Sequence, residues 1–316
     1  MKILRFSGNE SLFFMINGDK ISNFWDRIAY FPQCIVNGLV GDKNLIQVRY
    51  ISLLDDVKAT NIGSPARRLN NMFWASVDWV ALSKKLNGKV HVLDIGCGKG
   101  GSGNRFRTYL KRHFGSYSGL DLYKDESFPK EFTHIKDKAE NVSHYIDNTV
   151  NLITSQSALE HIENDLAVLK VLTENLGNRK KSFLQIHLVP ASFTLWTYLW
   201  HGWRQYSQRN LGLIASELCK NEKVRVIAIP LGGLKCHYIH FLKITVATLF
   251  KKILKIKSED KWGRENTATS IKIREIVVRE RNIKSLFPVF WVLMISNEEK
   301  NFEIFFEELK FLGPSH

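Results

Sequence analysis

A glycine-rich turn that follows a short apolar run is the stretch of this sequence with the clearest chemical meaning. Residues 90–95 form the apolar run, and glycines follow at positions 96, 98, 100 and 101. Glycine allows a positive φ and lets the backbone approach a ligand closely. Residues 102–114 are expected to form a helix, and the free N–H groups at its start favour anions. A strand, a glycine turn and a helix N-terminus in this order predict a cradle for a nucleotide-type cofactor.

Two carboxylates beside this turn help to distinguish between cofactors. Gly96, Gly98 and Gly101 satisfy the G-x-G-x-x-G pattern of dinucleotide sites, and an acidic residue follows about 20 positions later. Asp94, however, stands two positions before the first glycine. There it can reach a cationic amino group, whereas a carboxylate near a pyrophosphate would be repelled. Asp121 lies at the end of a second predicted strand and is placed to accept hydrogen bonds from ribose hydroxyls. These two positions favour S-adenosylmethionine over NAD.

Three motifs carry a resemblance to a known family. VLDIGCGKGG, YSGLDLY and ITSQSALEHIE resemble, in order and spacing, the first, second and fourth strand motifs of class I S-adenosylmethionine-dependent methyltransferases. The resemblance implies an α/β fold with a doubly wound, Rossmann-like, seven-stranded sheet and an antiparallel last strand. It implies that the glycines line the methionine end of the cofactor, that Asp121 holds the ribose and that the adenine lies beside residues 137–139. The implied cofactor-binding set is Asp94, Gly96, Gly98, Gly100, Asp121, Leu122, Asp137, Lys138, Ala139 and Ser155.

Two histidines at the predicted carboxyl edge of the sheet are candidates for acid–base work. Methyl transfer is a direct displacement, and an oxygen nucleophile must lose a proton as it reacts. Histidine can accept this proton because its side chain titrates near neutral pH. His161 follows the fourth predicted strand and is the leading candidate base; alternatively, Glu160 and His161 cap a helix or hold the cofactor loop. His187, at the end of the fifth predicted strand, is a competing base or a structural hydrogen-bonding residue.

An aromatic segment over residues 195–206 is a candidate acceptor region. It resembles, more loosely, the acceptor side of methyltransferases from bacterial cell-surface polysaccharide gene clusters. Aromatic faces suit stacking on sugars or bases, but they are also common in a core. The candidate acceptor-binding residues are Tyr198, His201, Arg204 and Tyr206.

Composition sets the broad class and compartment. The chain has 316 residues, of which 44% are hydrophobic and 24% charged, as in an ordinary globular protein. Its four cysteines are scattered without paired spacing, which predicts reduced thiols, a cytoplasmic location and no metal site. The first residues lack the apolar core of a signal peptide, and no window is apolar over the roughly 18–20 residues of a spanning helix.

The net charge of +14 favours a polyanionic partner, although part of it is expected to be solvated surface lysine. Lysines and arginines are dense over residues 251–284. Residues 238–257 have an apolar helical face opposite Lys251, Lys252 and Lys255, a pattern typical of a helix that lies on an anionic membrane. The same pattern fits a helix packed on the domain with its lysines in solvent. A peripheral position on the inner face of a membrane is therefore one expectation.

The chain divides into two predicted parts. Residues 1–85 form an N-terminal extension or lid packed on the core, with one helix over 66–86. Residues 86–316 form the methyltransferase domain, with a basic helical insertion at about 232–284. Strands are expected at 90–95, 116–122, 133–136, 149–154 and 182–188, with further strands at 224–229 and 287–295. A helix is expected at 164–176.

Three functions remain open at this point. The first is O-methylation of a sugar or other small polar acceptor, including a lipid-linked one, with His161 or His187 as base. The second is RNA methylation through the basic 251–284 surface, although no nucleic-acid module is recognisable. The third is a catalytically silent cofactor-binding interaction protein. The acceptor half of such folds varies freely, so the sequence leaves the acceptor open.

Overall fold

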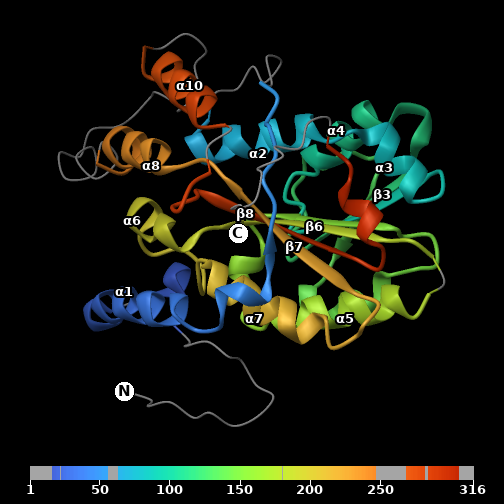
Figure 1. Cartoon of the computed structure of the whole chain (residues 1–316), viewed down its shortest axis with the longest axis horizontal. Coiled ribbons are helices and arrows are strands. Elements are labelled where there is room, and N and C mark those ends of the chain that lie inside the picture. Colours follow the sequence, from blue (N-terminus) through green and yellow to red (C-terminus); the bar gives the residue numbers. More distant parts are fainter. Residues whose placement is uncertain are drawn as a thin grey trace, which may run out of the picture.

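The molecule is built around one mixed β-sheet (Figure 1). The computed structural model describes residues 16–21, 23–55, 63–179, 181–246, 268–281 and 284–305. In the described residues the sheet has eight strands in the order β1-β7-β8-β6-β5-β2-β3-β4. The strands are β1 (Gln47–Val48), β2 (Val90–Ile95), β3 (Phe114–Asp121), β4 (Thr133–Lys136), β5 (Leu152–Gln156), β6 (Leu184–Pro190), β7 (Arg225–Leu231) and β8 (Phe290–Ser296).

The sheet confirms the predicted fold class. All neighbouring strands are parallel except that β8 runs antiparallel to both β6 and β7. The predicted antiparallel last strand is therefore present. The count of seven was one too low, because the short strand β1 from the N-terminal extension pairs with the outer edge of β7. A two-residue strand carries no periodic signal, so the sequence pattern could not show it.

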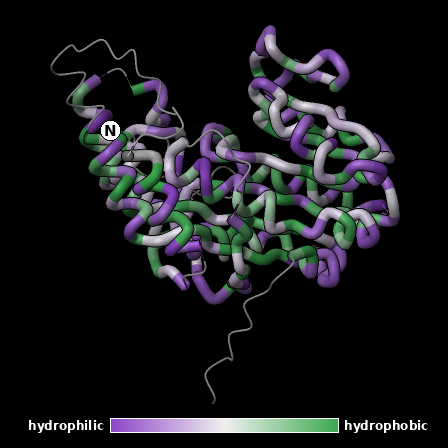
Figure 2. Tube along the Cα trace, turned by 90° about the horizontal axis from the view of Figure 1, so that it is seen from above, coloured by the Kyte–Doolittle hydropathy of each residue, from purple (hydrophilic) through white to green (hydrophobic). Residues whose placement is uncertain are grey.

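Helices cover both faces of the sheet, as Figure 1 shows. One face carries α2 (Pro65–Ser76), α3 (Trp79–Lys85), α4 (Gly101–Leu110), α8 (Leu234–His240) and α10 (Ala268–Glu280), and the other carries α1 (Phe24–Gly38), α5 (Asp165–Gly177) and α7 (Gln208–Leu218). Each face has its own buried apolar cluster, one with Leu69 and Phe73 of α2 and the other with Leu169 and Leu172 of α5. Figure 2 shows the hydrophobic segments running through the middle of the molecule.

Shorter helical segments connect these elements. The helix α6 (Leu195–Tyr198) lies between β6 and α7, and a π-helical turn, Phe241–Val246, continues α8. The 3₁₀ turns are Gly18–Lys20, Lys43–Leu45, Lys111–His113, Ala139–Tyr145, Leu159–His161, Ser192–Thr194 and Glu299–Phe302.

Two helix predictions need correction. The single helix expected over 66–86 is broken into α2 and α3, because Val77 is extended and bridges to Phe305. Asp78 then starts α3 by accepting hydrogen bonds from the N–H groups of Val80 and Ala81. The helix expected over 102–114 ends at Leu110 and continues only as the 3₁₀ turn before β3.

Within residues 232–284, where a basic helical insertion was predicted, the described residues contain α8, the π-helical turn and α10. The buried Glu280 carboxylate of α10 accepts hydrogen bonds from the N–H groups of Lys235 and Cys236 at the start of α8. Most of the predicted basic stretch lies outside the described residues, namely Lys251, Lys252, Lys255, Lys257, Lys261 and Arg264. Within the ranges given above, every helix is too short or too polar to cross a bilayer.

Candidate functional site

The glycine turn between β2 and α4 has the backbone shape that its sequence predicts. Gly96, Gly98 and Gly100 all have positive φ, at 72°, 51° and 71°. A Cβ added to Gly96 would lie 2.4 Å from the Cβ of Ala158, so this turn packs directly against the chain that leaves β5. A Cβ added to Gly98 would meet nothing within 4 Å. The turn is therefore closely packed at its first glycine and open at its second.

Asp121, at the end of β3, is joined to the open part of this turn. Its Oδ2 accepts a hydrogen bond of 2.8 Å from the N–H of Gly98, and its Oδ1 accepts one of 3.2 Å from the N–H of Tyr123. The side chain is half-buried, and the next residue, Leu122, is 50% exposed. A carboxylate and an exposed apolar side chain thus stand side by side at the carboxyl edge of the sheet.

Asp94 does not face a ligand as expected. It is 4% exposed, and its carboxylate accepts hydrogen bonds from the hydroxyls of Tyr117 and Thr154, at 2.7 and 2.8 Å. Burial raises the pKa of Asp94, and these hydrogen bonds oppose that rise. The side chain ties β2 to its neighbours β3 and β5 just before the turn. The expectation of a direct contact with a cationic amino group is therefore wrong in this structure, and Asp94 positions the turn.

The residues expected beside an adenine follow β4. The Asp137 N–H donates to the carbonyl of Asp121 at 3.2 Å, which places this segment next to the residue predicted to bind the ribose. The Asp137 carboxylate accepts hydrogen bonds from Tyr145, Asn141 and the N–H of Lys138, which lower the pKa of Asp137. Ala139 packs against the cluster that contains Leu120. The segment is thus fixed in place by its own hydrogen bonds.

Ser155 and His187 lie in the interior and face each other. Both are 0% exposed, and the Ser155 Oγ lies 2.8 Å from the His187 Nδ1. The other ring nitrogen lies 3.2 Å from the Oε1 of Gln185. Burial lowers the pKa of His187 to about 3, so the ring is neutral at physiological pH. His187 lies on β6, which is buried along its whole length, so it does not reach an acceptor as expected. Ser155 lies on the neighbouring strand β5, and its buried hydroxyl contacts His187 instead of facing a cofactor.

His161 is half-exposed and lies in a cluster with Asp19, Glu160 and His201. Its side chain is 39% exposed, and its Nδ1 lies 2.7 Å from the Oδ2 of Asp19. The hydrogen bond with Asp19 raises the pKa of His161, burial opposes this, and the charge of Glu160 adds to the rise. The His201 ring packs edge-on against the His161 ring with 4.7 Å between centroids. Because the Leu159–His161 turn directly follows Ala158, this cluster adjoins the glycine turn.

The four candidate acceptor-binding residues separate into two pairs. His201 and Tyr198 lie at the cluster, with 5.4 Å between their ring centroids. Arg204 and Tyr206 are instead 3% and 1% exposed, and both bind the buried carboxylate of Asp165. An arginine paired with a carboxylate in the interior has no face left for an acceptor. The expectation that Arg204 and Tyr206 contact the acceptor is therefore wrong.

Two members of the cluster were not identified as site residues from the sequence. Asp19 lies in a short polar segment far from every motif, and no local pattern indicates where it docks. Glu160 is 0% exposed, and in the described part of the chain neither of its carboxylate oxygens has a hydrogen-bond partner. Glu160 belongs to the ITSQSALEHIE motif, but the sequence of a Glu-His pair does not predict that the glutamate side chain is buried.

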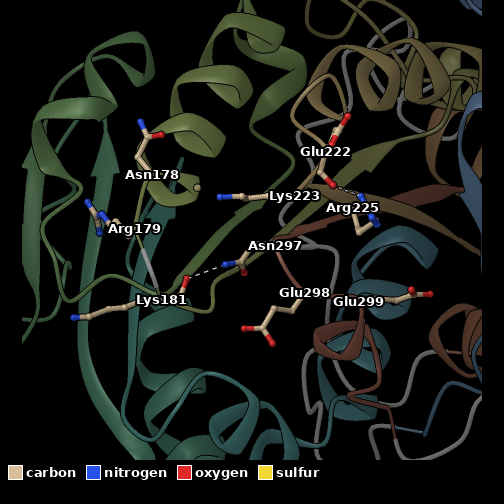
Figure 3. A pocket seen from close by; sticks show the side chains of 10 residues that line it. Asn178, Arg179, Lys181, Glu222, Lys223, Arg225, Asn297, Glu298 and Glu299 are labelled. Atoms are coloured by element: carbon tan, nitrogen blue, oxygen red, sulfur yellow. Dashed lines mark hydrogen bonds between the residues drawn. The ribbon is translucent and has the colours of Figure 1, made fainter.

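A polar hollow lies at the other edge of the sheet (Figure 3). It is lined by the end of α5, by Lys181 before β6 and by Asn297 after β8, whose side chain donates to the Lys181 carbonyl at 3.0 Å. Because β6 is parallel to β2, its start lies at the edge away from the glycine turn. The hollow is therefore separate from the candidate site.

Comparisons with known proteins gave structural matches only. No protein-family model and no curated protein sequence matches the chain. A SAM-dependent methyltransferase from Archaeoglobus fulgidus is similar with a TM-score of 0.43 and 16% identity over 76% of this chain and 97% of that chain. The plantazolicin methyltransferase BamL, in complex with a desmethylPZN analog and SAH, is similar with a TM-score of 0.39 and 17% identity. The match covers 74% of this chain and 90% of that chain. The small RNA methyltransferase HEN1 is similar with a TM-score of 0.42 and 15% identity, over 74% of this chain and 26% of that chain.

Proposed function

We propose that the chain is an S-adenosylmethionine-dependent methyltransferase that methylates an oxygen of a sugar or another small polar acceptor. The observation that carries the proposal is the link between the positive-φ glycine turn and Asp121, whose carboxylate accepts from the Gly98 N–H. In this proposal Gly96, Gly98 and Gly100 receive the methionine end of the cofactor. Asp121 accepts from the ribose hydroxyls, and Leu122 with residues 137–139 flanks the adenine.

The acceptor side of the proposal is the cluster around His161. In the reaction an oxygen lone pair of the acceptor forms a bond to the methyl carbon. The bond between that carbon and the sulfonium sulfur breaks, its electron pair stays on sulfur, and a neutral thioether results. The acceptor hydroxyl must release its proton as the new bond forms. His161 is half-exposed, is held by Asp19 and adjoins the glycine turn, so it is the candidate residue that promotes this loss.

Calorimetric titration tests the cofactor assignment. S-adenosylmethionine and, separately, NAD are titrated into the purified chain, into Asp121→Ala and into the control Glu131→Ala, which removes an exposed carboxylate paired with Arg107. We expect binding of S-adenosylmethionine that is lost in Asp121→Ala and kept in Glu131→Ala. Preference for NAD, or no binding of either compound, contradicts the proposal. An acceptor screen then starts from nucleotide sugars and lipid-linked glycans, with RNA as the competing class.

We also propose peripheral contact with an anionic membrane through α6, α8 and the π-helical turn. Leu234, Tyr238, Phe241 and Leu242 are 40–63% exposed, and Trp196 of α6 is 51% exposed. The Thr245 hydroxyl of the π-helical turn donates to the Thr197 carbonyl of α6 at 2.6 Å, so these segments are adjacent. Lys235 and Lys243 are exposed beside the apolar side chains. Exposed apolar side chains among lysines are typical of interfacial helices.

Vesicle cosedimentation tests this contact. We expect binding to vesicles that contain phosphatidylglycerol and much weaker binding to pure phosphatidylcholine. Replacement of the exposed Lys235 and Lys243 by glutamate should greatly weaken the binding. Unchanged binding in this double variant contradicts the proposal.

A further inference from the structure

Three side chains at the edge of the candidate site converge on one point. The Nε2 atoms of His161 and His201 lie 4.0 and 3.8 Å from the Oε1 of Glu160. One ligand atom from each of these residues lies within 4.8 Å of the other two. Glu160 and His161 come from the turn after β5, and His201 comes from the segment after α6. Two imidazoles and one carboxylate in this arrangement are a donor set that suits a metal ion.

The state of Glu160 provides a second and independent indication of a ligand. Its side chain is 0% exposed, and within the described residues neither oxygen has a hydrogen-bond partner. Removing a carboxylate from water without a partner costs several kcal/mol, roughly, and buried polar groups almost always have one. The two imidazoles are too far from Oε1 for hydrogen bonds. A cation between these three groups would supply the missing partner.

Asp19 orients the His161 imidazole from the other side and lies near that of His201. Its Oδ2 lies 2.7 Å from the Nδ1 of His161, and its Oδ1 lies 3.7 Å from the Nδ1 of His201. A hydrogen bond from Nδ1–H to a carboxylate fixes the tautomer in which the Nε2 lone pair is free. Metal-bound histidines commonly have such a carboxylate behind them. Asp19 therefore leaves the Nε2 atom of His161 directed toward Glu160.

We propose that Glu160, His161 and His201 bind a divalent transition-metal ion such as Zn²⁺, with Asp19 as the carboxylate that orients His161. The two nitrogen donors favour Zn²⁺ over Mg²⁺ and Ca²⁺, which prefer oxygen. Metal–ligand bonds of about 2.0–2.2 Å in a tetrahedral site place ligand atoms roughly 3.3–3.6 Å apart. The two separations from Oε1, 3.8 and 4.0 Å, would therefore close by a few tenths of an ångström, and the two ring nitrogens, which lie within 4.8 Å of each other, would also approach. Three protein ligands leave coordination positions open.

An open coordination position would let the cation bind the acceptor in the proposed methyl transfer. This role of the cation rests on the proposed function. A hydroxyl oxygen of the acceptor that binds the cation becomes more acidic, because the positive charge stabilises the alkoxide. Its proton leaves to water while the oxygen lone pair forms the bond to the methyl carbon. His161 thus promotes loss of the proton through the cation that it holds.

The test measures metal binding to the full chain, separately from activity. The protein is treated with chelator and dialysed, then titrated with ZnCl₂ in a calorimeter and with Co²⁺ while visible absorption is recorded. The variants are Glu160→Gln, His201→Ala and Asp19→Asn. The control is His113→Ala, which removes a histidine from the 3₁₀ turn before β3, at the far edge of the sheet. Thermal unfolding of each variant checks the fold.

We expect one Zn²⁺ per chain in the wild type and in His113→Ala. Affinity should fall by at least about 10-fold in Glu160→Gln and His201→Ala, and by about 10–100-fold in Asp19→Asn. No Zn²⁺ or Co²⁺ binding in the wild type overturns the site, as does unchanged affinity in a folded Glu160→Gln. Glu160→Gln keeps the side-chain shape, so it decides the outcome if His201→Ala does not fold. If the chain binds Zn²⁺ but not S-adenosylmethionine, the proposed function fails and the metal site stands; the reverse result overturns the metal site alone.

Discussion

The Nδ1 atom of His161 lies 2.7 Å from the Oδ2 of Asp19, a residue 142 positions earlier in the chain. The Asp19 segment is held in place by main-chain contacts: the Gly18 N–H donates to the Gly202 carbonyl at 2.7 Å. A segment near the start of the chain therefore supplies a side chain to the candidate site. If this segment packed elsewhere, His161 would lack the partner that orients it.

Substitution Asp19→Asn should lower the pKa of His161. The hydrogen bond that the His161 ring donates to this carboxylate raises the pKa of His161 above 6.5, and removing the charge takes the main cause away. An NMR titration of the His161 ring in chelator-treated protein measures the shift, with Glu126→Gln as a control for an exposed charge. An unchanged His161 pKa in Asp19→Asn would show that the pair has no electrostatic effect.

The same pair makes a prediction about stability against pH. Burial acts to raise the pKa of Asp19, but the hydrogen bonds from His161 and Gly202 and the nearby imidazoles give a net lowering. The pair therefore stabilises the fold where Asp19 is charged and His161 is protonated. This stabilisation is lost as pH rises through the raised pKa of His161 and as pH falls through the lowered pKa of Asp19. Urea unfolding of wild type and Asp19→Asn should differ most between these limits, and a constant difference at all pH values contradicts the assignment.

Alanine substitutions in the glycine turn should separate folding from cofactor binding. Gly98→Ala adds a methyl group that meets nothing within 4 Å, so only the positive φ opposes it, at about 1–2 kcal/mol. It should fold and bind S-adenosylmethionine weakly, because the methyl group enters the space assigned to the cofactor. Gly96→Ala should destabilise the fold further, because its Cβ would lie 2.4 Å from the Cβ of Ala158.

Gly88→Ala is the control for cofactor binding by this pair. Gly88 also has a positive φ, and a Cβ there would meet nothing within 4 Å, but it precedes β2 at the far edge of the sheet. Urea unfolding and calorimetry of all three variants give the comparison. Equal cofactor affinity in Gly98→Ala and Gly88→Ala would remove the turn from the binding site.

Substitution Arg204→Ala should destabilise the fold by about 3–5 kcal/mol, because it leaves the Asp165 carboxylate buried without its cation. Lys170→Ala, which breaks a partly exposed pair with Glu217, should cost about 0–1 kcal/mol. Equilibrium urea unfolding measures both values. If Arg204→Ala kept wild-type stability and only raised the KM for an acceptor, Arg204 would be a binding residue instead.

Substitution His187→Gln should reduce the loss of stability in acid. The unfolded histidine binds a proton below pH 6.5, whereas the folded pKa is about 3, so the wild type loses stability as pH falls between these values. The slope from this residue is about 1.4 kcal/mol per pH unit. Glutamine does not titrate, so the variant should have a shallower dependence from pH 6 to pH 4 in urea unfolding. An equal slope in both proteins would mean that His187 is protonated in the fold.

Local sequence determined the central part of the sheet and the glycine turn. The runs that became β2, β3 and β5 are short and apolar, and each is followed by turn residues, so their place in a parallel sheet follows from alternation with helices. The positive φ values of Gly96, Gly98 and Gly100 follow from the same local chemistry, because other residues rarely adopt this conformation. Asp121 was placed correctly at the carboxyl edge because it directly ends a strand.

Tertiary structure alone decided which polar side chains reach the site. Arg204, Tyr206 and His187 have the residue types of a binding site, yet the fold buries them and pairs them inside the protein. Asp19 and His201 meet His161 through contacts between segments far apart in the chain, and no periodicity records such contacts. Burial and partner choice depend on how whole elements pack, whereas a turn or a strand depends on neighbours within a few residues. The sequence therefore specified the glycine turn, and only the packing of the N-terminal segment and residues 198–202 formed the cluster around His161.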